Sequence, residues 1–274
     1  MQPVVAEPFS ATREVHVIPT LWPIPNVGYL PMNAFLLHAA EPVLVDTGAG
    51  LLSPQFLDAL ASIIRLDEIR WIWLTHEDRD HTGSLNRLLE LAPNARVIAD
   101  FFAIGRLGPE QSFPLDRLHV VTEGDRISVG DRDLTAIRPP LFDSPSTTGI
   151  LDNSSGVLFS SDCFGAPLPS LDEAAVTSIA EIDPLTLTQG QMSWAAVDSP
   201  WVTSVDTNIF ARSLDKIRRL EPTAILSSHL PPAHGHTEAM LANLAAAPDA
   251  PPAPGTTQAE LEALLATLEP ADSQ

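Results

Sequence analysis

Short apolar runs alternate with polar turns along most of the chain, and their spacing predicts strands before helices. Residues 13–22 alternate well enough to predict a strand, and residues 33–39 and 42–45 predict the next two, with a turn around Ala40 and Glu41. The opening of the chain is therefore expected to be β structure. Its third run, residues 43–45, ends at Asp46 in a glycine-rich turn.

Helical spacing begins at Ser53 and Pro54, which are typical of an N-cap and a first turn. The apolar face that follows consists of Phe56, Leu57, Leu60, Ile63 and Ile64. Later patterns predict a strand at 95–99, a hairpin within 121–137, two or three helices within 171–220 and a short helix at 257–268. Composition shifts to Pro and Ala at 248, so we expect one domain over 1–247 and a linker with a helix over 248–274.

The most informative stretch is a buried strand, residues 71–74, that runs directly into four side chains of metal-ligand type. These are His76, Asp78, Asp80 and His81. Imidazole and carboxylate groups at such spacing, held on the end of a strand, can converge on one point. A helix is expected to follow Thr82 and Gly83, with Leu85, Leu88 and Leu89 on its apolar face. A solvated acidic turn is the alternative, and the two histidines disfavour it.

Further candidates also stand at the ends of apolar runs. Asp162 follows residues 156–159 in a Cys-Phe-Gly turn, and His229 follows a short run that starts at 223. His234 and His236 are rivals of His229, which the strand-end position favours. Asp143, before Ser144 and Pro145, is on its residues alone better interpreted as a helix or turn cap. Asp46 is either a turn former or the acceptor for the second ring nitrogen of a site histidine. Trp194 and Trp201 are interpreted as core residues rather than pocket walls.

Charge and cysteine content narrow the class of protein. The chain holds 15 Lys and Arg against 35 Asp and Glu, a net charge of -20, so neither nucleic acid nor an anionic membrane surface is an expected partner. The single cysteine, Cys163, excludes an intrachain disulfide and a Cys-x-x-Cys iron site, and it is interpreted as a small buried apolar residue. No apolar run is long enough for a membrane span, and we expect a cytoplasmic protein.

The loop from His76 to His81 resembles that of the metallo-β-lactamase fold superfamily, which reads His-x-His-x-Asp-His. An acid at Asp78 is most similar to the flavodiiron proteins and the stand-alone oxygen-binding di-iron proteins, whose loop reads His-x-Glu-x-Asp-His. The run Leu-Phe-Ser-Ser-Asp-Cys-Phe-Gly around Asp162 also matches their pattern. Asp143 stands where that pattern has His. The resemblance covers roughly residues 13–245.

This resemblance implies a four-layer αββα sandwich, of the α/β (α+β) class, with two metal ions at one edge of the sheets. It assigns His76, Asp78 and Asp143 to one metal and Asp80, His81 and His229 to the other, with Asp162 as the bridge. Asp46 is expected to pack beneath the metals. One imidazole with three carboxylates is a hard, anionic set, which favours iron or manganese over zinc.

The resulting hypothesis is a non-haem di-iron protein that binds or reduces O2 or NO. A flavin domain does not fit within the chain, so a separate electron-donor protein is expected for reduction, and an oxygen carrier or sensor is the other form of the same hypothesis. A metallohydrolase of a thioester, lactone or phosphoester is the runner-up, which the acids at positions 78 and 143 disfavour because they weaken Lewis acidity. A degenerate metal-binding module comes third. The sequence leaves a homodimer open.

Overall fold

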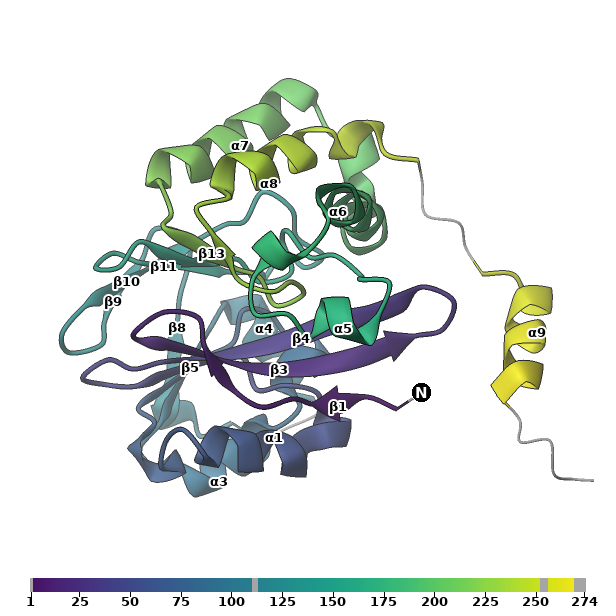
Figure 1. The fold of residues 1–274 in the computed structure, drawn as a ribbon. Helices are drawn as coiled ribbons and strands as arrows, with labels where there is room; N and C mark the ends of the chain where they lie inside the picture. The colour runs from purple at the N-terminus through teal and green to yellow at the C-terminus, as the bar shows by residue number, and fades with distance from the viewer. Residues whose placement is uncertain (1, 110–112, 252–255, 269–274) are drawn as a thin grey trace, which may run out of the picture.

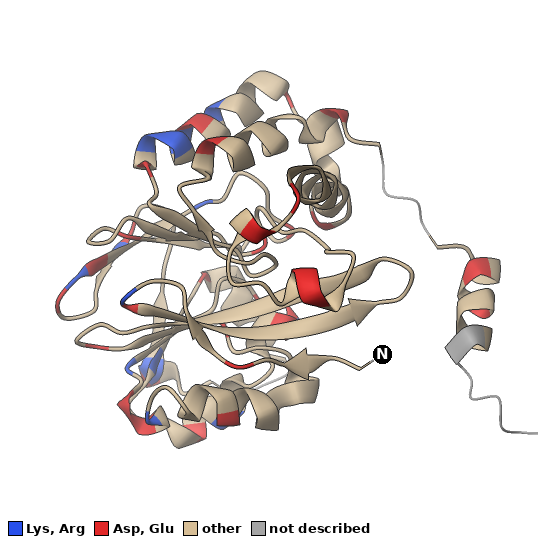
Figure 2. Ribbon diagram, in the orientation of Figure 1, with Lys and Arg blue, Asp and Glu red and all other residues tan. Residues whose placement is uncertain are grey.

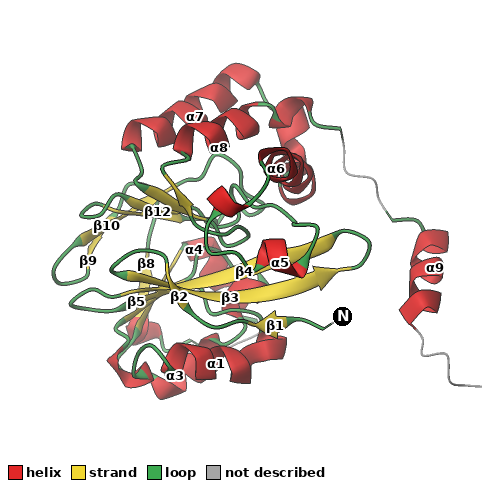
Figure 3. Ribbon diagram, viewed as in Figure 1, coloured by secondary structure: helices red, strands yellow, loops and turns green. Residues whose placement is uncertain are grey.

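The computed structural model describes residues 2–109, 113–251 and 256–268. Two β-sheets pack face to face, and helices cover the outer face of each sheet (Figures 1 and 3). This is the four-layer αββα sandwich of the α/β class that the sequence predicts. Among the described residues, no helix combines the length and the apolar character needed to cross a membrane.

The first sheet contains the amino-terminal half of the chain. Its strand order is β1-β3-β4-β5-β6-β7-β8, with β2 paired to β3. The strands are β1 Val4–Val5, β2 Phe9–Ser10, β3 Val15–Ile24, β4 Gly28–Leu37, β5 Val43–Val45, β6 Trp71–Trp73, β7 Arg96–Ala99 and β8 Leu118–Val120. Strands β5 to β8 are parallel. Parallel strands end at the same edge of a sheet, so the loops that follow β5 and β6 lie together.

The second sheet has the order β14-β13-β12-β11-β10-β9. Its strands are β9 Arg126–Ser128, β10 Asp133–Ile137, β11 Gly149–Asp152, β12 Val157–Phe159, β13 Ala224–Leu226 and β14 Ala233–His234. Strands β12 and β13 are parallel, with Phe159 opposite Leu226. The loops that carry Asp162 and His229 therefore leave this sheet side by side.

Helices on the two outer faces come from the two halves of the chain. Helices α1 Ser53–Ala61, α2 Arg79–Thr82, α3 Leu85–Leu91 and α4 Phe101–Leu107 belong to the first half. Helices α5 Leu171–Ala174, α6 Pro184–Asp198, α7 Thr207–Leu220 and α8 Thr237–Ala245 belong to the second. Short 3-10 turns lie at Gly50–Leu52, Leu66–Glu68, Leu115–Arg117, Ile179–Glu181, Pro200–Ser204 and Ala247–Asp249. Helix α9 Gln258–Leu268 stands apart from the sandwich (Figure 1).

The space between the sheets is filled by large side chains from both. Phe35 and Phe159 meet edge to face with ring centroids 5.4 Å apart, and Trp73 and Leu226 are fully buried beside them. Strands β5, β6, β12 and β13 are buried on both faces, so they read as continuous apolar runs rather than as alternating ones. These rigid strands hold the loops at their ends.

Several predicted boundaries were wrong by a few residues. Strand β4 begins at Gly28 rather than at 33, because Pro31 lies within the strand and obscures its pattern. Helix α1 ends at Ala61, and Ser53 is its first residue rather than its cap. Strand β8 was not predicted. The packed body continues to the buried residue Ala250. The division at 247/248 stays a prediction, since 252–255 and 269–274 lie outside the described residues.

Candidate metal centre

The seven residues predicted to bind metal lie together at the edge where the strands end. His76, Asp78, Asp80 and His81 follow β6, Asp143 follows β10, Asp162 follows β12 and His229 follows β13. Three groups of ligand atoms, each within 4.8 Å of one another, include all seven: His76, His81 and Asp162; Asp80, His81 and His229; His76, Asp78 and Asp143. His234 and His236, the rivals of His229, belong to none of these groups.

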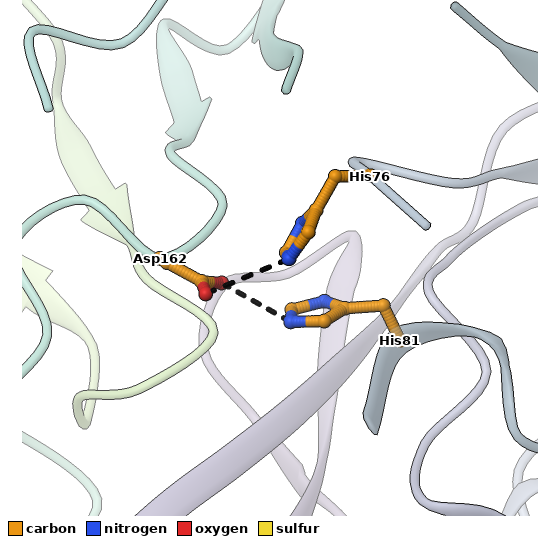
Figure 4. Close-up of side chains that lie close together, drawn as sticks. All are labelled: His76, His81 and Asp162. Atoms are coloured by element: carbon orange, nitrogen blue, oxygen red, sulfur yellow. Dashed lines mark ion pairs between the residues drawn. The ribbon is translucent and has the colours of Figure 1, made fainter. Parts of the chain in front are cut away.

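Asp162 stands at the centre of the cluster (Figure 4). Its Oδ1 lies 3.1 Å from His81 Nε2, and its Oδ2 lies 3.7 Å from His76 Nε2. Oδ2 also lies 3.3 Å from His229 Nε2. The carboxylate is 7% exposed and so meets three imidazoles in a nearly dry setting. Two oxygens that face different histidines can serve two cations at once.

Buried polar atoms without partners test whether a metal fits. Within the described residues, His76 Nε2, His81 Nε2 and Asp162 Oδ1 are buried and make no well-directed hydrogen bond, although His81 Nε2 and Asp162 Oδ1 lie 3.1 Å apart. Buried polar atoms in proteins nearly always have one. Here the orphaned atoms are nitrogen and oxygen donors turned toward a shared centre, which is the donor set that transition-metal ions take. The residues therefore fit a metal ion.

The electrostatics of the cluster lead to the same conclusion. Burial alone would lower the pKa of His229, but the charges of Asp162 and Asp80 outweigh it and raise the pKa to about 9. Burial likewise opposes a charged His81, yet Asp80, Asp162 and Asp46 hold its pKa well above the usual value. The pKa of Asp162 lies well below its usual value, against burial, because of the three histidines. The carboxylates thus demand positive charge at this point, which a metal ion can supply in place of protons.

Two oxygen atoms hold the rings of His81 and His229 in place through hydrogen bonds to Nδ1 of each ring. Asp46 Oδ2 lies 2.8 Å from His81 Nδ1, and the carbonyl oxygen of Pro31 lies 2.7 Å from His229 Nδ1. Carboxylate and carbonyl oxygens only accept, so Nδ1 of each ring donates and Nε2 faces the centre. Asp46 also accepts hydrogen bonds from the Thr75 amide and hydroxyl. These bonds hold Asp46 in a left-handed backbone conformation, with φ 62°.

The side of the cluster that contains Asp78 and Asp143 is more open. His76 Nε2 lies 3.6 Å from Asp143 Oδ2, and Asp78 and Asp143 are exposed residues, whereas Asp80 is half-buried. Burial raises the pKa of Asp78, and the negative charges of Asp143 and Asp80 add to this effect. His76 Nδ1 lies 3.2 Å from the Ser161 hydroxyl, not near a carboxylate. This side of the site is therefore richer in oxygen and less firmly braced.

The sequence did not reveal the role of Glu77. Its side chain is 8% exposed and accepts a hydrogen bond of 2.8 Å from the Ser144 hydroxyl, and it also contacts Ser146 and Arg106. Although burial opposes it, these donors lower the pKa of Glu77. The residue ties the loop after β6 to the loop that carries Asp143. The one signal of this role in the sequence was the position of Glu77 between two candidate ligands, His76 and Asp78.

Asp198 was also missed. It forms a fourth group with Asp143 and Asp162, whose ligand atoms lie within 4.8 Å of one another. Burial, together with the negative charges of Asp162 and Asp143, raises the pKa of Asp198 to about 7. The residue ends α6, and no sequence pattern distinguishes it from an ordinary helix-terminal acid.

The cluster opens into a cavity of about 920 Å³, lined in part by Leu30, Met32, Trp194 and Asp198. Trp194 donates a hydrogen bond of 3.0 Å to the carbonyl of Asp162 and lies 4.7 Å from the His229 ring, so its interpretation as a core residue was wrong. Trp201 instead packs against the core beneath α6 and donates to the Phe142 carbonyl. Gly165 makes the approach of Trp194 possible, since a Cβ there would lie 2.6 Å from Trp194 Nε1.

Comparison with known proteins agrees with this geometry. A 31% identical stretch of 134 residues, 48% of this chain and 28% of the relative, matches an anaerobic nitric oxide reductase flavorubredoxin of Enterobacter sp. (strain 638). The fold is similar to that of the rubredoxin oxygen:oxidoreductase of Desulfovibrio gigas, with a TM-score of 0.75 and 19% identity over 88% of this chain and 61% of that one. The match to this curated relative thus spans less than a third of the relative's length.

A fragment of a putative diflavin flavoprotein from Nostoc sp. PCC 7120 has a TM-score of 0.73 and 16% identity, and the match covers 91% of this chain and 98% of the fragment. A family model described as ODP family beta lactamase matches residues 30–229, well over half of the chain. That interval contains every residue of the cluster. The chain therefore belongs to the ODP family of beta-lactamase-fold proteins.

Proposed function

We propose that this chain is a non-haem di-iron protein that binds or reduces O2 or NO. The observation that carries the proposal is the pair of ligand groups joined through Asp162, one of which contains more carboxylates than imidazoles. Such a hard, anionic group suits iron or manganese better than zinc. The relatives named for nitric oxide reduction and for oxygen reduction support the choice of O2 or NO as substrate.

In this proposal each metal takes one of the two outer groups. His76, Asp78 and Asp143 would hold the first metal, Asp80, His81 and His229 would hold the second, and Asp162 would be shared between them. When bound, the irons would supply the binding site for O2 or NO and the electrons passed to it. Asp46 and the Pro31 carbonyl orient the two histidines, and Leu30, Met32 and Trp194 provide an apolar wall that limits water around the site.

Turnover needs an electron donor, and we infer a separate protein for this role. The net charge of -20 favours a basic donor or a contact at a locally basic surface. Figure 2 shows basic residues on α7 and acidic residues on α5 and α9. A homodimer belongs to the same proposal. So does a reducing, cytoplasmic setting, which the single cysteine leads us to expect.

The proposal is tested by loading the protein with iron without oxygen, reducing it and then mixing it with O2 or with NO. An absorption change that depends on two irons per chain is expected. A protein that binds iron but shows no spectral response to either gas would contradict the redox proposal. Zinc-loaded protein is the control, because it has the same ligands and no redox chemistry.

The volume of the cavity supports one second candidate, a metallohydrolase. About 920 Å³ is far more than O2 needs and lies within the range of sites for small organic molecules. In this candidate the same metals would activate water for attack on a thioester, lactone or phosphoester. Steady hydrolysis of such substrates by zinc- or manganese-loaded protein, lost in Asp80→Ala, would favour it over the di-iron proposal.

A further inference from the structure

Helix α6 ends in an aspartate that faces the cluster. Asp198 lines the cavity, and its carboxylate lies within 4.8 Å of ligand atoms of Asp143 and Asp162. The seven predicted ligands do not include it. It therefore requires its own physical explanation.

The position is unfavourable for a negative charge in three ways. The residue is partly buried, it lies beside two other carboxylates, and it occupies the carboxyl end of a helix of 15 residues, where the helix dipole is also negative. In the part of the chain that the structure describes, its hydrogen bond comes from the Ser199 hydroxyl, at 2.9 Å. A neutral hydroxyl does not offset the charge, so the carboxyl group must take up either a proton or a cation.

A second and independent observation points to the same place. His76 Nε2 is buried without a hydrogen-bond partner, and it lies 3.6 Å from Asp143 Oδ2 and 3.7 Å from Asp162 Oδ2, on this side of the cluster. The His76 side chain is 0% exposed. A cation near Asp143, Asp162 and Asp198 would satisfy this atom and also offset most of the charge of the three acids.

We propose that Asp198 is an additional ligand of the metal held by His76, Asp78 and Asp143. The proposal rests on the two-metal part of the proposed function and deepens it. With Asp162, this metal has one imidazole and four carboxylates, a set that disfavours zinc still more strongly. The whole site then has five carboxylates. Two divalent cations neutralise the charge of four of them, so one negative charge is left over. The fifth carboxylate favours the oxidised state of one iron.

The test compares wild type with Asp198→Asn and Asp198→Glu. Asparagine keeps an acceptor for Ser199 and removes the charge, whereas glutamate restores a carboxylate. Asp58→Asn is the matched control, since it makes the same change on the exposed face of α1. Manganese and zinc affinities are measured by competition with a chelator, and the reduction potential of the iron-loaded protein is measured by titration.

For Asp198→Asn we expect manganese affinity at one of the two sites to fall by at least about tenfold, as loss of a group that holds a metal typically causes. Zinc affinity should fall less, the reduction potential should rise, and Asp198→Glu should recover part of both. Unchanged manganese affinity and an unchanged potential in Asp198→Asn would overturn the inference, while the two-metal proposal would stand. Wild type that binds no metal would instead refute the proposed function.

Discussion

The two halves of the candidate metal centre are built differently. In the half with Asp80, His81 and His229, both histidines are about 2% exposed, and oxygen atoms fix both rings from behind. In the half with His76, Asp78 and Asp143, the two acids lie near the surface and come from different loops. The first half is pre-organised by the sheets, and the second depends on contacts between loops.

This difference indicates a division of roles. In the proposed site, the braced, nitrogen-rich group would fix where the metals bind, because its rings cannot turn without breaking buried hydrogen bonds. The more open, carboxylate-rich group would decide which metal is preferred, because charge and hardness vary most there. Changes in the braced half should therefore act on affinity alone, whereas exchange of a ligand in the open half should also change selectivity.

Asp162→Ala should have the largest effect, because Asp162 belongs to both halves. We expect metal content to fall from two ions to about one or fewer per chain, since the variant loses a shared ligand and leaves buried imidazoles unpaired. Elemental analysis after gel filtration measures this, with Asp58→Ala as the control. Retention of two tightly bound metals by Asp162→Ala would show that the halves do not share a bridge.

Asp46→Asn should affect only the braced half. An amide has one acceptor oxygen where the carboxylate has two, so it cannot accept from both the Thr75 amide and His81 Nδ1. We therefore expect affinity for one metal to fall by about 10- to 100-fold. Chelator competition gives the two affinities separately. Ser161→Ala is the comparison, because Ser161 contacts His76 Nδ1 in the open half and should weaken the other metal. If both variants weakened both metals equally, the division of the site would be wrong.

Asp143→His should change selectivity more than affinity. A neutral nitrogen in place of an anionic oxygen makes the open half softer and less negative, so the ratio of zinc to iron affinity should rise several-fold. The ratio is measured by loading from an equimolar mixture of both metals. A preference unchanged from wild type would mean that Asp143 does not reach the metal.

Glu77→Gln should have the smallest effect. It removes a buried charge that accepts from Ser144 and contacts Arg106, at a cost of about 1–3 kcal/mol in stability. Metal affinity of the open half should fall only a few-fold, since the ligands remain. Thermal unfolding of the metal-free variant measures the first effect. An unaltered melting temperature would argue against Glu77 as the link between the loops.

Residues that follow a buried strand were predictable from the sequence. Asp162 and His229 follow apolar runs, and the two histidines after β6 are close in sequence. That all of them meet was expected only from the family resemblance, because β6 and the strands β12 and β13 lie in different sheets. Asp198 could not be predicted in this way, because its meeting with Asp143 depends on how α6 packs over the second sheet. The contact of Pro31 with His229 was equally hidden, since it depends on strand β4 crossing to the loop after β13.

The most direct test of the account is the number of metal ions per chain in protein expressed with iron and zinc both available, followed by its melting temperature before and after chelation. We predict two ions per chain, iron in preference to zinc, and a clear fall in melting temperature when they are removed, because bound metal stabilises the folded state. Less than one ion per chain, with a melting temperature that chelation does not change, would contradict the account.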